Sequence, residues 1–263
     1  MNNIDNTEKN CLDPNSRVVA GRNSVIELMK SGRQIDKILI KKGDMEGSLV
    51  RIAAMAKERS LSVVYAESEA LDYAADIKSH QGVVAMCACK EYVSVDDILA
   101  FAKSKNEPPF IVIADGIEDP YNLGAVIRSA EAAGAHGVII PKKRAVGLTP
   151  SVAKSSAGAV EYMNIAKVTN ISVTVEDLKK AGVWVYAADA NADKYYYDAD
   201  LKGAVAIVVG GEGKGVRRLV RESCDGVMKI PMSGNVTSLN VSAAAAIVLF
   251  EAVRQRIKTS DGK

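Results

Sequence analysis

The sequence predicts an α/β protein built around a mostly parallel sheet. Short apolar runs alternate with stretches of helical spacing along most of the 263 residues, which is the pattern of alternating strands and helices. In the C-terminal half the predicted strands are apolar throughout. Such strands are covered on both faces, which is typical of parallel sheets. A break in the pattern at residues 91–108 divides the chain into two parts.

The first part, residues 16–90, has the size of a small α/β domain. Residues 1–15 are polar and unpatterned, and we expect them to be disordered. After them the spacing predicts helices at Ser24–Lys30, at Ser48–Arg59 and around Ala70, and strands at Ile35–Ile40, Leu61–Tyr65 and Gly82–Cys89.

Residues 91–108 are predicted to link the two parts. They hold one amphipathic helix, Val95–Ala102, followed by a polar run that ends in Pro108 and Pro109. Consecutive prolines after a charged run cannot continue a helix, so we expect the domain boundary here.

The second part, residues 109–263, should form the larger sheet. Buried-type strands are predicted at Phe110–Ala114, Gly137–Ile140, Val183–Ala187, Ala204–Val209 and Val227–Ile230. Helices lie between most of them, and a long helix at Ser238–Ile257 closes the chain.

Composition excludes several classes of protein. Hydrophobic residues make up 48% and charged residues 25%, which is typical of a globular chain. No apolar run reaches the ~20 residues of a membrane span, and the polar N-terminus does not resemble a signal peptide. Four scattered cysteines and two histidines predict neither a disulfide framework nor a metal site, so we expect a cytoplasmic protein. The net charge of +2 means that any nucleic-acid partner must be held by a local basic patch.

A Gly-rich loop, Gly210–Gly215, follows a predicted strand, at the position where open α/β sheets bind ligands. It does not fit a dinucleotide fingerprint, because the place of the last glycine is taken by Val216. It does not fit a P-loop either, because Lys214 is followed by Gly215. Alone, the loop is equally consistent with a plain turn.

A second loop follows the strand Phe110–Ala114. Asp119 and Pro120 predict a helix start, as N-cap and first helical residue. The acidic residues of this loop could hold Mg²⁺, but capping and solvation explain them more simply. On the predicted helix, Arg128 is either functional or an ordinary surface residue, solvated or paired with Glu131.

A third loop, after Val227–Ile230, leads into the closing helix. Ser238 and Asn240 stand at the expected helix start, so simple capping explains both as well as a functional role does. Basic residues gather at two places, in Lys142–Arg144 and on the helix after the Gly-rich loop, at Lys214, Arg217, Arg218 and Arg221. Such a face suits phosphates, although a solvated helix face is the more usual explanation.

Taken together, the three loops resemble the three motifs of the SpoU (TrmH-like) RNA 2′-O-ribose methyltransferases of the SPOUT superfamily. The segments that carry the resemblance are Asn122–Ala130, Gly210–Gly215 and Ile230–Ser242. The first part of the chain is similar to the L30e-like substrate-binding domain of some members, through Gly21–Val25 and His80–Gly82. Minimal tRNA-modifying members lack this domain. The resemblance therefore points to the 23S rRNA guanosine-2′-O-methyltransferase (RlmB) group, with antibiotic-resistance rRNA methyltransferases as near relatives.

The resemblance implies S-adenosyl-L-methionine as methyl donor, a deep trefoil knot, a homodimer, and RNA, above all 23S rRNA, as partner. The positions that match the family's cofactor-binding residues are Gly210, Gly211, Ile230, Met232 and Leu239. The positions that match its catalytic residues are Asn122, Arg128, Glu212, Ser238 and Asn240. A charged guanidinium is a poor proton acceptor, so Arg128 is expected to be essential without accepting the proton, and Glu212 is the conventional acceptor candidate.

Other functions remain open at this point. They are a tRNA ribose methyltransferase, an antibiotic-resistance rRNA methyltransferase, a base-methylating SPOUT enzyme and a non-enzymatic RNA-binding protein. The Asn122 and Arg128 pattern argues against base methylation, since it resembles that of the ribose-modifying group. His80 and His136 lie outside the three motifs, and we expect both to be structural.

Overall fold

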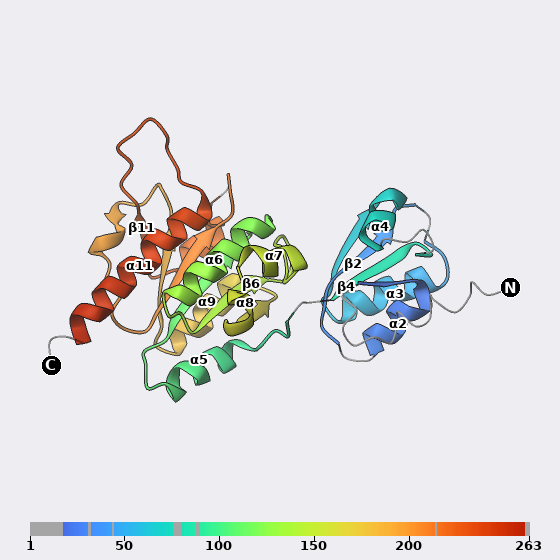
Figure 1. Cartoon of the computed structure of the whole chain (residues 1–263), viewed down its shortest axis with the longest axis horizontal. Coiled ribbons are helices and arrows are strands. Elements are labelled where there is room, and N and C mark those ends of the chain that lie inside the picture. The colour runs from blue at the N-terminus through green and yellow to red at the C-terminus, as the bar shows by residue number, and fades with distance from the viewer. Residues whose placement is uncertain are drawn as a thin grey trace. The chain divides into compact units, whose positions relative to one another are not determined.

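A computed structural model describes residues 18–30, 33–43, 45–75, 80–87, 90–213 and 215–260. The chain forms two compact units, Met1–Glu91 and Tyr92–Lys263, which are the blue-to-cyan and the green-to-red parts of Figure 1. Residues 1–15, expected to be disordered, lie outside the described residues.

The first unit is a four-stranded mixed sheet with helices on both faces. The strand order is β1-β4-β2-β3, in which β2 is parallel to β3 and antiparallel to β4, and β1 is antiparallel to β4. The strands are β1 Val18–Ala20, β2 Ile35–Lys41, β3 Ser62–Ala66 and β4 Val83–Cys87, and the helices are α2 Arg22–Lys30, α3 Ser48–Glu58 and α4 Ser68–Ala75. Every element expected here is present. The pattern did not predict β1, because three residues show no periodicity.

The core of this unit has two parts, one on each side of the sheet. Helices α2 and α3 bury Met29 and Ile52 against Ile38. Helix α4 buries Leu71 against Leu39 and Val84 on the opposite face.

The second unit contains a seven-stranded sheet in the order β7-β6-β5-β10-β8-β11-β9. All of its neighbouring strands are parallel, which confirms the predicted class. The strands are β5 Phe110–Asp115, β6 Gly137–Pro141, β7 Ile165–Val168, β8 Trp184–Ala188, β9 Lys194–Tyr195, β10 Val205–Gly210 and β11 Gly226–Lys229. The sequence did not predict β7 and β9, which are short strands at the two edges.

Two groups of helices cover this sheet. One face is buried under α5 Val95–Ser104, α9 Ile171–Lys180 and α10 Arg218–Ser223. Helix α6 Pro120–Ala132 packs against α11 Val241–Ser260 and contacts β6, and α11 contacts β10 on the other face (Figure 1). The short helices α7 Pro150–Ser155 and α8 Ala159–Tyr162 pack on α6, and a 3₁₀ turn, η1, spans Tyr196–Asp198. No helix in the described parts of the chain is long and apolar enough to cross a bilayer.

The sequence predicted a linker at residues 91–108, but most of this segment belongs to the fold of the second unit. The division falls between Glu91 and Tyr92, and α5 belongs to the second unit. Ile98 on this helix is fully buried in the core with Ile111 and Ile139. The apolar stripe of α5 therefore covers the sheet. The polar run after α5 connects this helix to β5.

The closing helix begins at Val241, three residues later than expected, so Ser238 is not its cap. The side-chain oxygen of Asn240 accepts a hydrogen bond from the Ser242 amide at 2.9 Å, and the Asn240 carbonyl accepts the Ala244 amide at 3.0 Å. Residues 231–240 instead form an exposed irregular loop. From β11 the chain returns across the sheet to place α11 against β10 and α6. That this path is threaded as a trefoil knot, as the family resemblance implies, stays a prediction.

Candidate active site

Two glycines bring the loops after β5 and β10 into backbone contact. A Cβ atom on Gly210 would lie 2.0 Å from the carbonyl carbon of Gly215. A Cβ atom on Gly211 would lie 2.3 Å from the carbonyl oxygen of Gly116. The Gly211 amide also donates to the Asp115 carbonyl at 3.0 Å. No side chain fits at either position, so this crossing requires glycine.

A pocket of about 610 Å³ opens beside this crossing. Its volume is that of a small-molecule site. Seven of the predicted site residues line it: Gly211, Glu212, Ile230, Met232, Ser238, Leu239 and Asn240. Three others, Asn122, Arg128 and Gly210, are not among the described residues of its wall.

Asn122, Glu212 and Asn240, one from each loop, form a hydrogen-bonded triangle. The side-chain amide of Asn122 donates to Glu212 Oε1 at 3.0 Å. The amide of Asn240 donates to the same oxygen at 2.8 Å and to Asn122 Oδ1 at 2.9 Å. Asn122 lies 90 residues from Glu212 and 118 residues from Asn240 along the chain, so the triangle joins the three motifs at the pocket.

Sequence reasoning missed an ion pair between the buried Asp115 and the partly exposed Arg217, which holds two of these loops together. Asp115, at the end of β5, is 1% exposed, so neither solvation nor capping explains it. Its Oδ1 accepts from Arg217 Nε at 2.7 Å and also from the second guanidinium nitrogen, and its Oδ2 accepts the Arg217 amide at 2.9 Å. The position of an acidic residue at a strand end was visible in the sequence, but its partner 102 residues away was not. Asp119 does cap α6, as predicted, by accepting the Asn122 amide at 2.8 Å.

The basic helix after the Gly-rich loop is largely neutralised within the chain. Besides Arg217, Arg218 pairs with Glu222 at 2.8 Å and Arg221 pairs with Asp189 at 3.3 Å. Lys214 lies outside the described residues. The three arginines are therefore paired within the chain, and a face of free cations that would suit phosphates is not found among the described residues of this helix.

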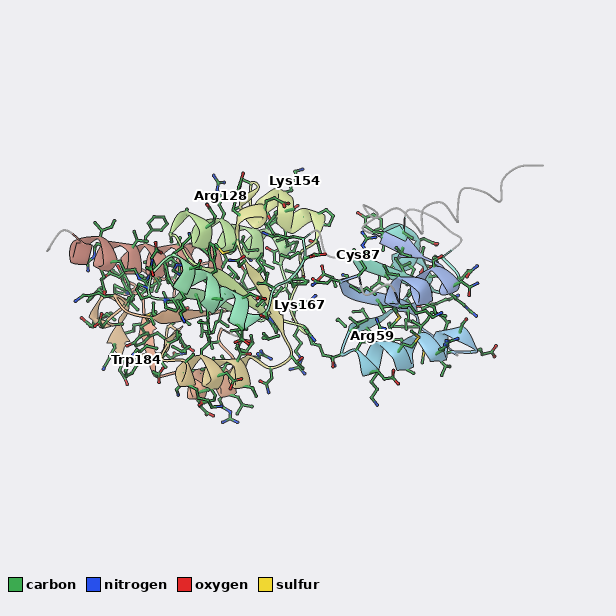
Figure 2. The ribbon with its side chains drawn as sticks, turned by 90° about the horizontal axis from the view of Figure 1, so that it is seen from below. Arg59, Cys87, Arg128, Lys154, Lys167 and Trp184 are labelled. Carbon is green, nitrogen blue, oxygen red and sulfur yellow. The ribbon has the colours of Figure 1, made fainter. Side chains whose placement is uncertain are left out.

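Arg128 projects from α6 into solvent (Figure 2). It makes no ion pair with any residue that the structure describes, so the possible pairing with Glu131 is not formed. One turn earlier, Gly124 packs so tightly that its Cβ would lie 1.9 Å from Ser155 Oγ, which fixes α6 against α7. Arg128 is therefore an unpaired cation on a rigid helix.

Both histidines have structural partners. His80 is buried, and its Nε2 lies 3.1 Å from Asp72 Oδ1. His136 Nδ1 accepts the Phe110 amide at 3.0 Å, and its Nε2 lies 3.0 Å from Glu107. Burial lowers the pKa of His136 below its ordinary value, against an opposing effect of Glu107. In the described ranges no group of three His, Cys, Asp or Glu residues is placed to hold a metal ion.

Two protein families match the chain, one for each unit. The SpoU rRNA Methylase family matches residues 109–250. The family described as RNA 2′-O ribose methyltransferase substrate binding matches residues 18–93.

Individual proteins give the same picture. YacO of Bacillus subtilis strain 168, named for the TrmH family of tRNA/rRNA methyltransferases, is 44% identical over 90% of this chain and 95% of its own length. The SpoU methyltransferase AviRb from Streptomyces viridochromogenes, solved in complex with AdoMet, is 25% identical with a TM-score of 0.58, over 96% of this chain and 97% of that one. The TrmH/SpoU tRNA modifying enzyme of A. aeolicus is 27% identical with a TM-score of 0.54, over 63% of this chain and 85% of that one.

Proposed function

Because the chain belongs to the SpoU family of RNA 2′-O-ribose methyltransferases, we propose that it methylates a guanosine of 23S rRNA, using S-adenosyl-L-methionine as the donor. The observation that carries the proposal is the triangle of Asn122, Glu212 and Asn240 beside the pocket. It places one polar residue from each of the three motifs at a small-molecule cavity.

The pocket has the character needed for the methyl donor. Gly211 lines it together with the apolar residues Ile230, Met232 and Leu239. Gly210 does not line the pocket. Because it has no side chain, the backbone of the Gly-rich loop can turn back and pass close to it at Gly215. The structure of AviRb with AdoMet supports a donor of this kind for the present chain. S-adenosyl-L-methionine supplies the methyl group on a positively charged sulfur.

The residues around the pocket divide the remaining work. Glu212 Oε1 is held by two amide donors, while its Oε2 has no hydrogen-bond partner among the described residues. We assign Oε2 the role of accepting the 2′-hydroxyl proton. Ser238 lines the same pocket and is available to orient the ribose. Arg128, as an unpaired cation, binds the RNA and stabilises charge during transfer.

The first unit supports an rRNA target. It matches a substrate-binding family. The A. aeolicus tRNA modifying enzyme, in contrast, matches 63% of this chain, which is no more than the length of the second unit alone. We assign this unit the selection of RNA, as in the RlmB group. Ribosomal RNA processing places the protein in the cytoplasm. A 2′-hydroxyl acceptor also restricts the substrate to RNA.

A homodimer completes the site in this proposal. Arg128 is exposed and stands apart from the wall of its own pocket. Helix α11 also leaves large apolar side chains exposed at Ile247, Phe250 and Ile257. A two-fold contact through this region would cover them and bring the Arg128 of one subunit to the pocket of the other.

The test is a map of ribose methylation in rRNA and tRNA from a strain that lacks the gene. We expect one 23S rRNA guanosine to lose its 2′-O-methyl group and to regain it when the wild-type gene is restored. Loss of a methyl group only from tRNA would replace the proposed target with a tRNA. Unchanged methylation in both RNA classes would contradict the proposal.

A further inference from the structure

A second basic cluster, unlike the one after the Gly-rich loop, has no ion-pair partner among the residues that the structure describes. Between Pro141 and Val160 the chain carries four basic residues and no acidic one: Lys142, Lys143, Arg144 and Lys154. None of the four forms an ion pair with a residue in the described part of the chain. All except the half-buried Lys142 are exposed. We call these four residues the basic surface.

The basic surface adjoins the first motif. Its loop follows β6, which is the parallel neighbour of β5, so both loops leave the same edge of the sheet. The Val146 amide donates to the Ile117 carbonyl at 2.9 Å. At the other end, Ser155, next to Lys154, donates through Oγ to the Pro120 carbonyl at 3.0 Å. Figure 2 shows Lys154 and Arg128 projecting from the same side of the second unit.

The backbone of the basic surface is held in place. Arg144 has a φ of 57°, a left-handed backbone conformation that a residue other than glycine adopts where its surroundings impose it. Thr149 caps α7 by accepting the Val152 amide, and the Leu148 amide donates to the Tyr92 hydroxyl at 2.9 Å. The charges are therefore displayed from a fixed loop rather than from a loose one.

We propose that the basic surface binds phosphate groups of the substrate RNA on the strand that flanks the methylated ribose. This inference rests on the proposed function and adds an RNA contact in the second unit to the selection made by the first. No large hydrophobic side chain is exposed between residues 141 and 160 of the described chain. Protein partners are usually anchored by such side chains. Four cations without apolar anchors instead match a polyanion.

The test compares two variants that lose the same charge. The first is Lys142→Gln, Lys143→Gln and Arg144→Gln. The control is Lys103→Gln, Lys105→Gln and Lys180→Gln, which removes three exposed cations on or next to α5 and α9, on the opposite face of the sheet. A 23S rRNA transcript is titrated at several salt concentrations, and S-adenosyl-L-methionine affinity, thermal unfolding and sedimentation are measured beside it.

We expect the first variant to bind RNA about 10- to 100-fold more weakly at low salt. The slope of log affinity against log salt should fall by roughly 2, since each lost single-strand contact contributes ~0.7. Donor affinity should not change, and the charge-preserving variant Lys142→Arg, Lys143→Arg and Arg144→Lys should bind RNA like the wild type. An RNA affinity and slope equal to those of the control would overturn the inference, as would a change in subunit assembly. A wild-type protein that binds RNA but methylates none would refute the proposed function. The comparison of RNA binding between the variants would still test the basic surface.

Discussion

At the residue scale, three loops supply the polar side chains beside the pocket, and Asn122, Glu212 and Asn240 connect them by hydrogen bonds. Seven predicted residues line one cavity because they follow parallel strands whose ends meet at one edge. The Asp115–Arg217 pair escaped prediction, since Asp115 ends β5 and Arg217 precedes α10, and nothing local relates them. For Asn240 the sequence could not separate helix capping from a functional role, because the residue both caps α11 and donates to Glu212.

Replacing Glu212 separates proton acceptance from positioning. Glu212→Gln keeps an oxygen for the two amide donors but removes the carboxylate. We expect kcat to fall by ~10²–10³, as for loss of a general base, with the donor affinity kept within a few-fold. Steady-state kinetics and calorimetry on Glu212→Gln and Glu212→Ala check this. Near wild-type kcat in Glu212→Gln, with a loss only in Glu212→Ala, would assign Glu212 a positioning role alone.

At the element scale, long periodic segments were predicted well and short or loop-bounded ones were not. The pattern found α6 with its Asp119 cap and the buried strands β5, β6, β8 and β10. It missed β7 and β9, which are short edge strands. It misplaced the start of α11, because polar residues suited to capping occur throughout residues 233–240.

The glycine crossing gives a matched pair of variants. Gly211→Ala places a methyl group against the Gly116 carbonyl, whereas the Cβ of Gly203→Ala would meet nothing within 4 Å. We expect Gly211→Ala to lose ~1–3 kcal/mol of stability through overpacking and to weaken donor binding. Gly203→Ala should do neither. Thermal unfolding and calorimetry measure both, and equal behaviour of the two variants would contradict the assigned role of the crossing.

His136 couples the stability of the second unit to pH. Its Nδ1 accepts the Phe110 amide at the start of β5, so the folded protein holds the neutral ring. Burial lowers its pKa, with Glu107 opposing and Lys105 and Arg256 reinforcing the shift. Below about pH 6.5 the unfolded chain therefore binds more protons than the folded one, and stability falls as pH drops toward the lower folded value. Urea unfolding at about pH 7.5 and about pH 5.5 should show a smaller loss in His136→Gln than in the wild type; an equal loss would contradict this.

At the scale of the whole molecule, we expect the two units to have separate tasks. Because α5 belongs to the second unit, a fragment of that unit must begin near Tyr92 and not after the prolines. We expect the fragment 92–263 to fold and bind the methyl donor but to methylate rRNA poorly. Circular dichroism, calorimetry and a methylation assay check the three properties. Native rates of rRNA methylation by the fragment would show that the first unit does not select RNA.

The shared site can be tested by mixing two inactive chains. Arg128→Ala should lower activity by ~10²–10³ while leaving donor affinity intact. Mixed with Gly211→Trp, it can form one complete site per heterodimer by two-fold symmetry, so roughly a quarter to a half of wild-type activity should return. Recovery is measured after subunit exchange has been demonstrated. Exchange without recovery would place each site within a single chain.

The central claim is that this protein transfers a methyl group to a ribose 2′-hydroxyl of RNA. The most direct measurement incubates purified protein with labelled S-adenosyl-L-methionine and unmodified 23S rRNA, then digests the RNA to nucleosides and identifies the labelled product by mass spectrometry. We expect label in 2′-O-methylguanosine with the wild-type protein and loss of this label with Arg128→Ala. Label on a base, or no labelled nucleoside from rRNA or tRNA, would contradict it.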